Sequence, residues 1–112
     1  MLPRPNRLTK SKEIQGVLRR GEGVKRKSLL LKIGVPTSPP KFAVVVGRKV
    51  SKKATVRNKV RRRIREALRQ ELRTIKKGSY VVLALPGSAT LGFQDICEAL
   101  HQAFQQTRNS HD

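Results

Sequence analysis

The chain is predicted to fold as a single α+β domain in which helices pack on a mixed β-sheet. A length of 112 residues and a 37% share of hydrophobic residues suit one small core, and they exclude two folded domains. Apolar residues recur every three or four positions in some segments and follow strand patterns in others. The predicted order of elements is α-β-β-α-β-α, and its central strand-helix-strand unit favours a sheet with parallel and antiparallel pairs.

A short first helix of about three turns is predicted before Gly21. Thr9 or Ser11 can cap its start, and Gly21 can end it. Its apolar face consists of Ile14, Val17 and Leu18.

Two strands are predicted to follow, over residues 29–35 and 42–46. The first alternates apolar residues with Leu30, Lys32 and Gly34, which is the period of a strand with one buried face. Three prolines within 36–40 make the intervening segment a turn, so the two strands are expected to pair as a hairpin. The second strand is apolar on both faces and is therefore expected at the centre of the sheet.

The longest helix is predicted over residues 55–75, where seven apolar residues recur every three or four positions, and Gly78 is expected to end it. A third buried strand over 80–85 and a last helix over 92–106 complete the domain. The two ends of the chain are expected to be flexible: 1–8 and 107–112.

The charge of the chain is strongly positive and uneven. Its 26 Lys and Arg residues exceed its 7 Asp and Glu residues by 19, and the isoelectric point is near 11.6. Residues 1–77 hold 25 of these cations and 4 of the acids, whereas residues 78–112 carry a net charge of −2. Solubility alone needs a net charge of only about 2 to 8. The excess indicates a polyanionic partner, of which nucleic acid is the leading candidate.

The composition argues against a membrane or secreted protein. No Trp and only three Phe make a membrane-surface helix a poor fit, and no apolar run approaches the roughly 20 residues of a spanning helix. The N-terminus has prolines and arginines where a signal peptide needs an apolar run. Cys97 is the only cysteine, so a disulfide framework and a thiolate metal cluster are excluded. We therefore expect a cytoplasmic protein with no membrane partner.

The predicted long helix carries a basic face opposite its apolar face. Its span from Arg57 to Arg73 contains seven Arg and one Lys. Arginine grips phosphate bidentately, and backbone N–H groups at a helix N-terminus point the same way, so phosphate binding is favoured over a merely solvated face. Arg57 and Arg61 fall inside or beside the apolar stripe. Their side chains are expected to stay free of the core, because the start of the helix would project beyond the sheet and a buried guanidinium would be costly.

The segment from Gly47 to Glu66, GRKVSKKATVRNKVRRRIRE, closely resembles the signature of the protein subunit of bacterial ribonuclease P. The resemblance covers nearly the whole chain, since Asn6-Arg7-Leu8 and the predicted elements also fall where that family has them. It implies a two-layer α/β sandwich with a left-handed βαβ crossover, although right-handed crossovers dominate in proteins. It also implies an accessory subunit of an endoribonuclease that removes the 5′ leader of precursor tRNA, while the RNA subunit performs the hydrolysis with bound Mg²⁺.

The resemblance implies two sets of binding residues and no DNA partner. The catalytic RNA would contact the start of the long helix and its basic flank: Arg48, Lys49, Lys52, Lys53, Arg57, Asn58, Lys59, Arg61, Arg62 and Arg65. The single-stranded leader of precursor tRNA would lie in a cleft between the first helix and the sheet, lined by Arg7, Lys10, Ile14, Leu18, Arg26 and Leu31.

Two departures from the family pattern affect these sites. Lys59 stands where the family has an arginine, which keeps the charge but loses the bidentate fork. Ile14, Leu18 and Leu31 stand at or near positions where the family often has aromatics. Base stacking on aromatics is worth about 1–3 kcal/mol per base. Leader binding is therefore expected to depend more on shape and on Lys and Arg.

No catalytic residue, metal ligand or cofactor is predicted in the protein itself. Asp95 and Glu98 suit the first turn of the last helix, where the helix dipole favours acids. His101 and His111 have no ligand partner, and Cys97 lies on an apolar stripe and is expected in the core. The alternative is a basic ribosomal protein or a general RNA chaperone, which would need charge without the ordered Arg-Asn motif.

Overall fold

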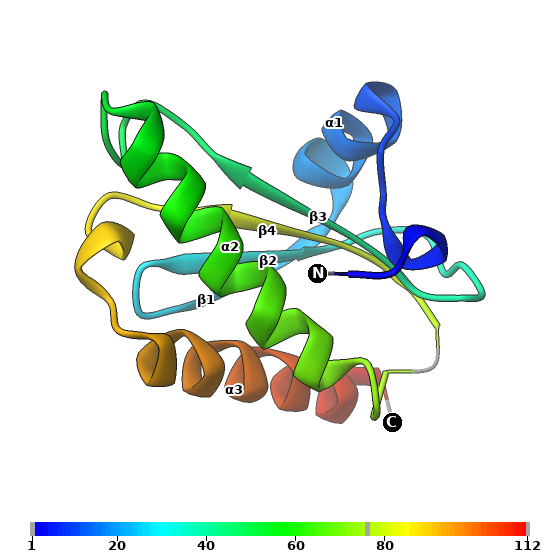
Figure 1. Ribbon diagram of the computed structural model, residues 1–112. Helices are drawn as coiled ribbons and strands as arrows, with labels where there is room; N and C mark the ends of the chain where they lie inside the picture. The colour runs from blue at the N-terminus through cyan, green and yellow to red at the C-terminus, as the bar shows by residue number, and fades with distance from the viewer. Residues whose placement is uncertain (1, 76, 112) are drawn as a thin grey trace.

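The computed structural model describes residues 2–75 and 77–111, with side chains as far as Thr107 in the last helix. Within these residues a four-stranded sheet packs with three α-helices (Figure 1). The elements are α1 (Ser11–Arg20), β1 (Glu22–Arg26), β2 (Leu29–Ile33), β3 (Lys41–Val46), α2 (Ala54–Glu71), β4 (Ser79–Ala84) and α3 (Phe93–His111), with short 3-10 turns η1 (Arg4–Asn6) and η2 (Ser88–Thr90). The predicted α+β class and element order are confirmed, and β1 is an additional strand.

The strands lie in the order β1-β2-β4-β3. β1 and β2 form an antiparallel hairpin, β2 pairs antiparallel with β4, and β3 pairs parallel with β4. The predicted hairpin between 29–35 and 42–46 is therefore wrong. The chain instead reverses before β2, where Lys27 has a φ of 52°. The loop after β2 then passes the start of β4, where the Gly78 N–H donates to the Thr37 carbonyl at 2.8 Å.

β3 lies at an edge of the sheet. The prediction that this strand lies at the centre is therefore wrong. Both of its faces are nevertheless covered, because Phe42 and Val46 belong to the core under α2 and α3, while Ala43 packs under α1. The N-terminal segment covers its free edge, where the Leu8 N–H donates to the Phe42 carbonyl at 2.7 Å. An apolar strand thus indicates two covered faces, but it does not distinguish an edge strand from a central one.

The N-terminal segment packs on the domain and is not the flexible arm expected from the sequence. Leu2 and Leu8 are only 4% and 6% exposed. The Asn6 side-chain amide donates to the Pro40 carbonyl at 2.8 Å, which ties this segment to the loop before β3. Residues 2–8 therefore form part of the folded structure.

The helix boundaries differ from the predicted ones by a few residues. Lys10 occupies the N-cap position of α1, so neither Thr9 nor Ser11 caps that helix. α2 ends several residues before its predicted end. α3 extends beyond its predicted end, so that 107–111 are helical, and residue 112 lies outside the described residues. None of the described helices is long and apolar enough to cross a membrane.

The main core lies between one face of the sheet and helices α2 and α3; in Figure 1, α2 crosses in front of the strands and α3 runs below them. From α2 it receives Val60, Ile64 and Leu68, none more than 1% exposed. Each such side chain contributes about 1.5–3 kcal/mol when buried. A smaller cluster lies on the other face of the sheet, where Val17 of α1 packs with Val81. The predicted sandwich of helices and sheet is confirmed, and α1 covers part of the second face.

The β3-α2-β4 unit is a left-handed crossover. β3 and β4 are adjacent and parallel, and in Figure 1 both run from right to left, with β3 above β4 and α2 in front of them. The path from β3 through α2 to β4 therefore turns in the left-handed sense, against the usual preference. This confirms the handedness that the resemblance implies.

We predict that Leu8→Ala lowers the free energy of unfolding by about 2–4 kcal/mol, because it empties a buried position between α1 and β3. Equilibrium urea unfolding measures this loss. Arg4→Ala, at an exposed position of the same segment, is the control and should change stability little. Equal stability of Leu8→Ala and the wild-type protein would show that the N-terminal segment does not pack on the domain.

Candidate nucleic-acid interface

The loop between β3 and α2 gathers cations at one end of the molecule. A turn in which the Val50 N–H donates to the Gly47 carbonyl at 3.1 Å shapes its first half. The Lys53 N–H then donates to the Ser51 hydroxyl at 3.2 Å, just before α2 begins. The four cations of the loop are all exposed: Arg48, Lys49, Lys52 and Lys53.

Two arginines of α2 bind the backbone around this loop. The Arg57 guanidinium donates to two loop carbonyls at 3.0 and 2.9 Å. Arg61 donates to the Val46 carbonyl at the end of β3 at 3.2 Å and to Asn58 Oδ1 at 2.6 Å. Both arginines are half-buried and are not free, contrary to the expectation from the sequence. They fix the loop and the start of α2 to the end of the sheet.

The other cations at the start of α2 face solvent. Lys59, Arg62 and Arg65 are exposed, as is Asn58. Lys59, Arg62 and Arg65, together with the four loop cations, form what we call the cationic surface. Because the N-terminus of α2 adds oriented N–H groups, this surface can bind several phosphates at once.

The ion pairs found among the described residues include none of the seven residues of the cationic surface. They join Lys27 to Asp95 and Glu98, Arg69 to Glu66, and His101 to Glu71. The two pairs of Lys27 join the β1-β2 turn to the start of α3. The contact between His101 and Glu71 joins α3 to α2. Four acids, Asp95, Glu98, Glu66 and Glu71, thus take part in contacts within the fold. None of the ion pairs of the described residues neutralises the cationic surface.

A hollow of about 310 Å³ lies between the N-terminal segment, α1 and β3. Arg7 and Ile14, which the sequence predicts for the leader cleft, line it together with Arg65 of the cationic surface. Leu18 is half-buried in the small cluster under α1, and Lys10 is exposed at the start of that helix. Lys10, Ile14 and Leu18 follow one another at helical spacing, so they lie along one side of α1.

Leu31 and Arg26 do not belong to this hollow, and their prediction as cleft residues is wrong. Leu31 is 1% exposed in the main core, on the face of the sheet that α2 and α3 cover. Arg26 donates to the Gln106 side chain on α3 and to the Lys25 carbonyl. The pleat of β2 directs Leu31 to the core, and a hydrogen bond holds Arg26 against α3.

Lys32, and not Leu31, lies on the α1 face of β2. Its ammonium donates to the Gly21 carbonyl, at the end of α1, at 3.3 Å. A side chain built on Gly23 of β1 would meet both Leu30 and Lys32, which places these two residues on one face. The alternation along the strand is the signal that identifies this face. No signal in the sequence shows that Arg65 lines the hollow, because that depends on how α2 lies against β3.

The acid and thiol side chains near α3 have structural roles. Hydrogen bonds from the Lys27 ammonium and the Gly92 N–H hold the pKa of Asp95 below its usual value. Burial raises the pKa of the Cys97 thiol, with a further contribution from the Glu71 carboxylate, so the thiol is a poor nucleophile at neutral pH. No three His, Cys, Asp or Glu side chains among the described residues could hold a metal ion.

Exposed arginines and lysines gathered at one helix start, beside a hollow with basic residues at its rim, are the features of a protein that binds a polyanion such as RNA. Residues 2–108 match the family model described as Ribonuclease P. The chain therefore belongs to the ribonuclease P protein family, whose members are accessory protein subunits of a tRNA-processing endoribonuclease. The family match does not support the alternative of a ribosomal protein or a general RNA chaperone.

Solved structures share the fold. The RNase P protein of Staphylococcus aureus is 19% identical, with a TM-score of 0.78 over 91% of this chain and 94% of that chain. The RNase P protein of Thermotoga maritima is 24% identical, with a TM-score of 0.78 over 89% of this chain and 96% of that chain. The Thermotoga maritima protein in complex with 1-(4-fluorophenyl)-2-thiourea is 26% identical over 86% and 94%, with a TM-score of 0.71. No curated protein sequence matches the chain.

We predict that Arg61→Ala lowers the free energy of unfolding by about 1–2 kcal/mol, because the Val46 carbonyl and the Asn58 side chain lose a charged donor. Arg62→Ala removes an exposed charge from the same helix turn and should change stability by less than about 0.5 kcal/mol. Urea unfolding of the free protein measures both variants. Equal losses would contradict the assignment of Arg61 to the fold and of Arg62 to the partner.

Proposed function

We propose that the cationic surface docks this ribonuclease P protein on the catalytic RNA and that the hollow beside α1 holds the 5′ leader of precursor tRNA. The observation that carries the proposal is the concentration of exposed cations at the start of α2. Arg57 and Arg61 bind this region to backbone carbonyls, so the cations are positioned before the RNA arrives. A positioned surface loses less conformational entropy when it binds.

The chemistry of the cationic surface suits a folded RNA. Arg62 and Arg65 present planar guanidinium groups that can each bind two phosphate oxygens, whereas Lys59 offers a point charge. These residues would contact the RNA backbone and therefore recognise its shape more than its base sequence.

The hollow would bind a single strand without aromatic stacking. Phe42, Tyr80 and Phe104 pack against one another in the core, with ring centroids 5.2 to 6.2 Å apart. They are therefore not available as stacking platforms. Arg7 and Arg65 at the rim can hold leader phosphates, and Ile14 supplies an apolar wall. Leader recognition by shape and charge, as expected from the sequence, is part of the proposal.

In this scheme the RNA subunit carries out the hydrolysis and holds the Mg²⁺ that supports it. The protein neutralises phosphates where the catalytic RNA and precursor tRNA meet, so the two polyanions can approach each other with less bound cation. We expect the complex to act in the cytoplasm, where precursor tRNA is transcribed.

Adding the protein to the catalytic RNA of the same organism should increase the rate of 5′ processing of precursor tRNA at low Mg²⁺, because the protein replaces counterions around the RNA. Single-turnover cleavage assays measure the effect. The double variant Arg62→Ala and Arg65→Ala should lose most of the stimulation, whereas Lys25→Ala, an exposed position on β1, should keep it. No stimulation by a protein that still binds ribosomal RNA would refute the proposed function.

The affinity for the catalytic RNA should fall roughly a thousandfold between about 50 and 200 mM salt, if about six phosphates are neutralised. Removing Arg62 and Arg65 together should reduce the slope of log affinity against log salt by about 1–2. Filter binding over a salt series measures both slopes. Identical slopes for the wild-type protein and the double variant would exclude these arginines as phosphate contacts.

A further inference from the structure

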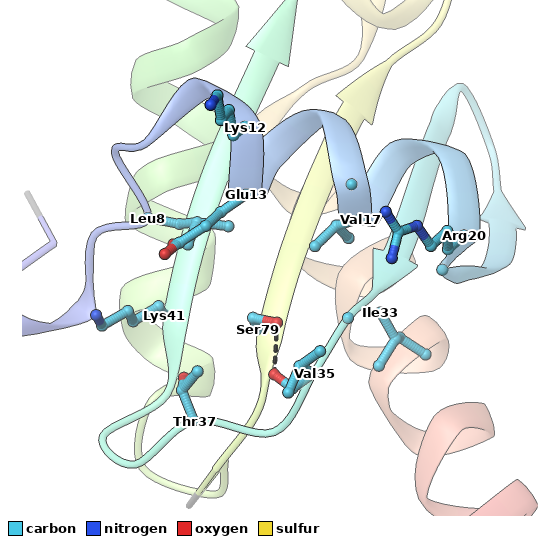
Figure 2. A pocket seen from close by; sticks show the side chains of 13 residues that line it. Leu8, Lys12, Glu13, Val17, Arg20, Ile33, Val35, Thr37, Lys41 and Ser79 are labelled. Carbon is cyan, nitrogen blue, oxygen red and sulfur yellow. Dashed lines mark hydrogen bonds between the residues drawn. The ribbon is translucent and has the colours of Figure 1, made fainter.

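A second groove, of about 670 Å³, lies on the opposite side of α1 from the leader hollow (Figure 2). Its walls are the side of α1 that carries Gly16 and Arg20 and the loop after β2 that carries Val35 and Thr37. Ile14, on the other side of α1, lines the hollow instead. The groove is therefore distinct from the cleft in which the leader is proposed to lie.

Hydrogen bonds fix the loop wall of this groove. The Ser79 hydroxyl donates to the Val35 carbonyl at 2.6 Å, shown as the dashed line in Figure 2, and the Gly34 N–H donates to the Ser79 carbonyl at 2.7 Å. The Thr37 hydroxyl donates to the Gly78 carbonyl at 3.0 Å. Val35 is held by these bonds with its side chain 76% exposed. An apolar side chain held in solvent at the mouth of a groove suits contact with the flat face of a ligand.

The charges around the groove suit an anionic ligand. Figure 2 shows Lys12, Glu13 and Arg20 on α1 and Lys41 at the start of β3. The floor between them is apolar and includes Val17. An apolar floor with cations at the rim fits a nucleotide, whose base would cover the floor while its phosphates meet the cations. The Glu13 carboxylate can accept an N–H from the edge of the base.

Gly16 lies in the α1 wall of the groove, and no neighbouring residue requires a glycine there. Glycine in the middle of a helix destabilises it relative to alanine. A Cβ on Gly21 would clash with the Ile33 carbonyl, and one on Gly34 would clash with the Val17 side chain, so packing explains both of these glycines. A Cβ on Gly16 would meet nothing within 4 Å. Packing therefore does not require glycine at position 16, and the missing side chain leaves the helix backbone open to a ligand.

The groove and the hollow meet at Leu8, which lines both. Leu8 lies just before α1 and is only 6% exposed, so the two spaces lie on either side of the chain that leads into that helix. To reach both spaces, a single strand would cross the outside of the chain at residues 8–11, between the hollow and the groove.

We infer that this groove binds a nucleotide of the 5′ leader upstream of the nucleotides in the hollow. The inference rests on the proposed function, because it requires the leader to lie in the hollow first. The base would contact Val17 and Val35, and the flanking phosphates would meet Lys12 and Lys41.

The test compares two precursor tRNAs in the reconstituted holoenzyme, one with a short leader that ends in the hollow and one with a longer leader. Gly16→Leu places a side chain in the groove, and leucine also favours a helix, so this variant is expected to fold. Gln15→Leu adds the same side chain at an exposed position outside the groove and is the matched control. Dissociation constants for both substrates are measured by gel shift.

The wild-type holoenzyme should bind the longer leader about tenfold more tightly, the gain expected when one further base covers apolar surface and its phosphates meet the cations. Gly16→Leu should abolish this advantage without changing the affinity for the short leader, and Gln15→Leu should keep it. Lys12→Ala combined with Lys41→Ala should weaken binding of the longer leader alone.

Three results would overturn the inference while leaving the proposed function intact. The first is equal affinity of the wild-type holoenzyme for both leaders, and the second is tighter binding of the longer leader by Gly16→Leu. The third is equally weakened binding of both substrates by Gly16→Leu, which would assign the groove to the catalytic RNA or to another partner. Failure of the wild-type protein to stimulate cleavage of either substrate would instead contradict the proposed function.

Discussion

The burial of one face of α2 is the constraint on which the rest of the structure depends. Val60, Ile64 and Leu68 are held between the sheet and α3, and this packing fixes the rotation of the helix about its axis. Lys59 and Arg62 consequently face solvent, and Arg61 reaches the last carbonyl of β3. One helix thus supplies both the core and the binding charge, and its rotation cannot change without disturbing both.

The two faces of the sheet have different tasks. The face under α2 and α3 holds the larger core. The ion pairs of Lys27 with Asp95 and Glu98 join the β1-β2 turn to the start of α3. The other face is covered only in part by α1, which leaves a hollow on one side of this helix and a groove on the other. The larger core thus lies on one face of the sheet, and the opposite face keeps the two hollows in which we propose that a single strand binds.

The sequence was sufficient for the properties that depend on local periodicity. The apolar stripe of α2, its cationic face and the three predicted strands follow from residue spacing alone. β1 was missed because Val24 is its only apolar residue, and the strand order was missed because parallel pairing through α2 joins segments far apart in the chain. The roles of Arg57 and Arg61 were missed for a different reason. Their partners are backbone carbonyls, which are present in every sequence and become visible only in the fold.

The central claim is that the loop before α2 faces the catalytic RNA in the holoenzyme. Photo-crosslinking tests it most directly: a crosslinker is attached to Lys52→Cys in a Cys97→Ser background, and the same reagent is attached to Gln94→Cys at the exposed start of α3. We expect efficient crosslinks to the catalytic RNA from position 52 and few from position 94. Equal crosslinking from both positions, or crosslinking from position 94 alone, would contradict the account.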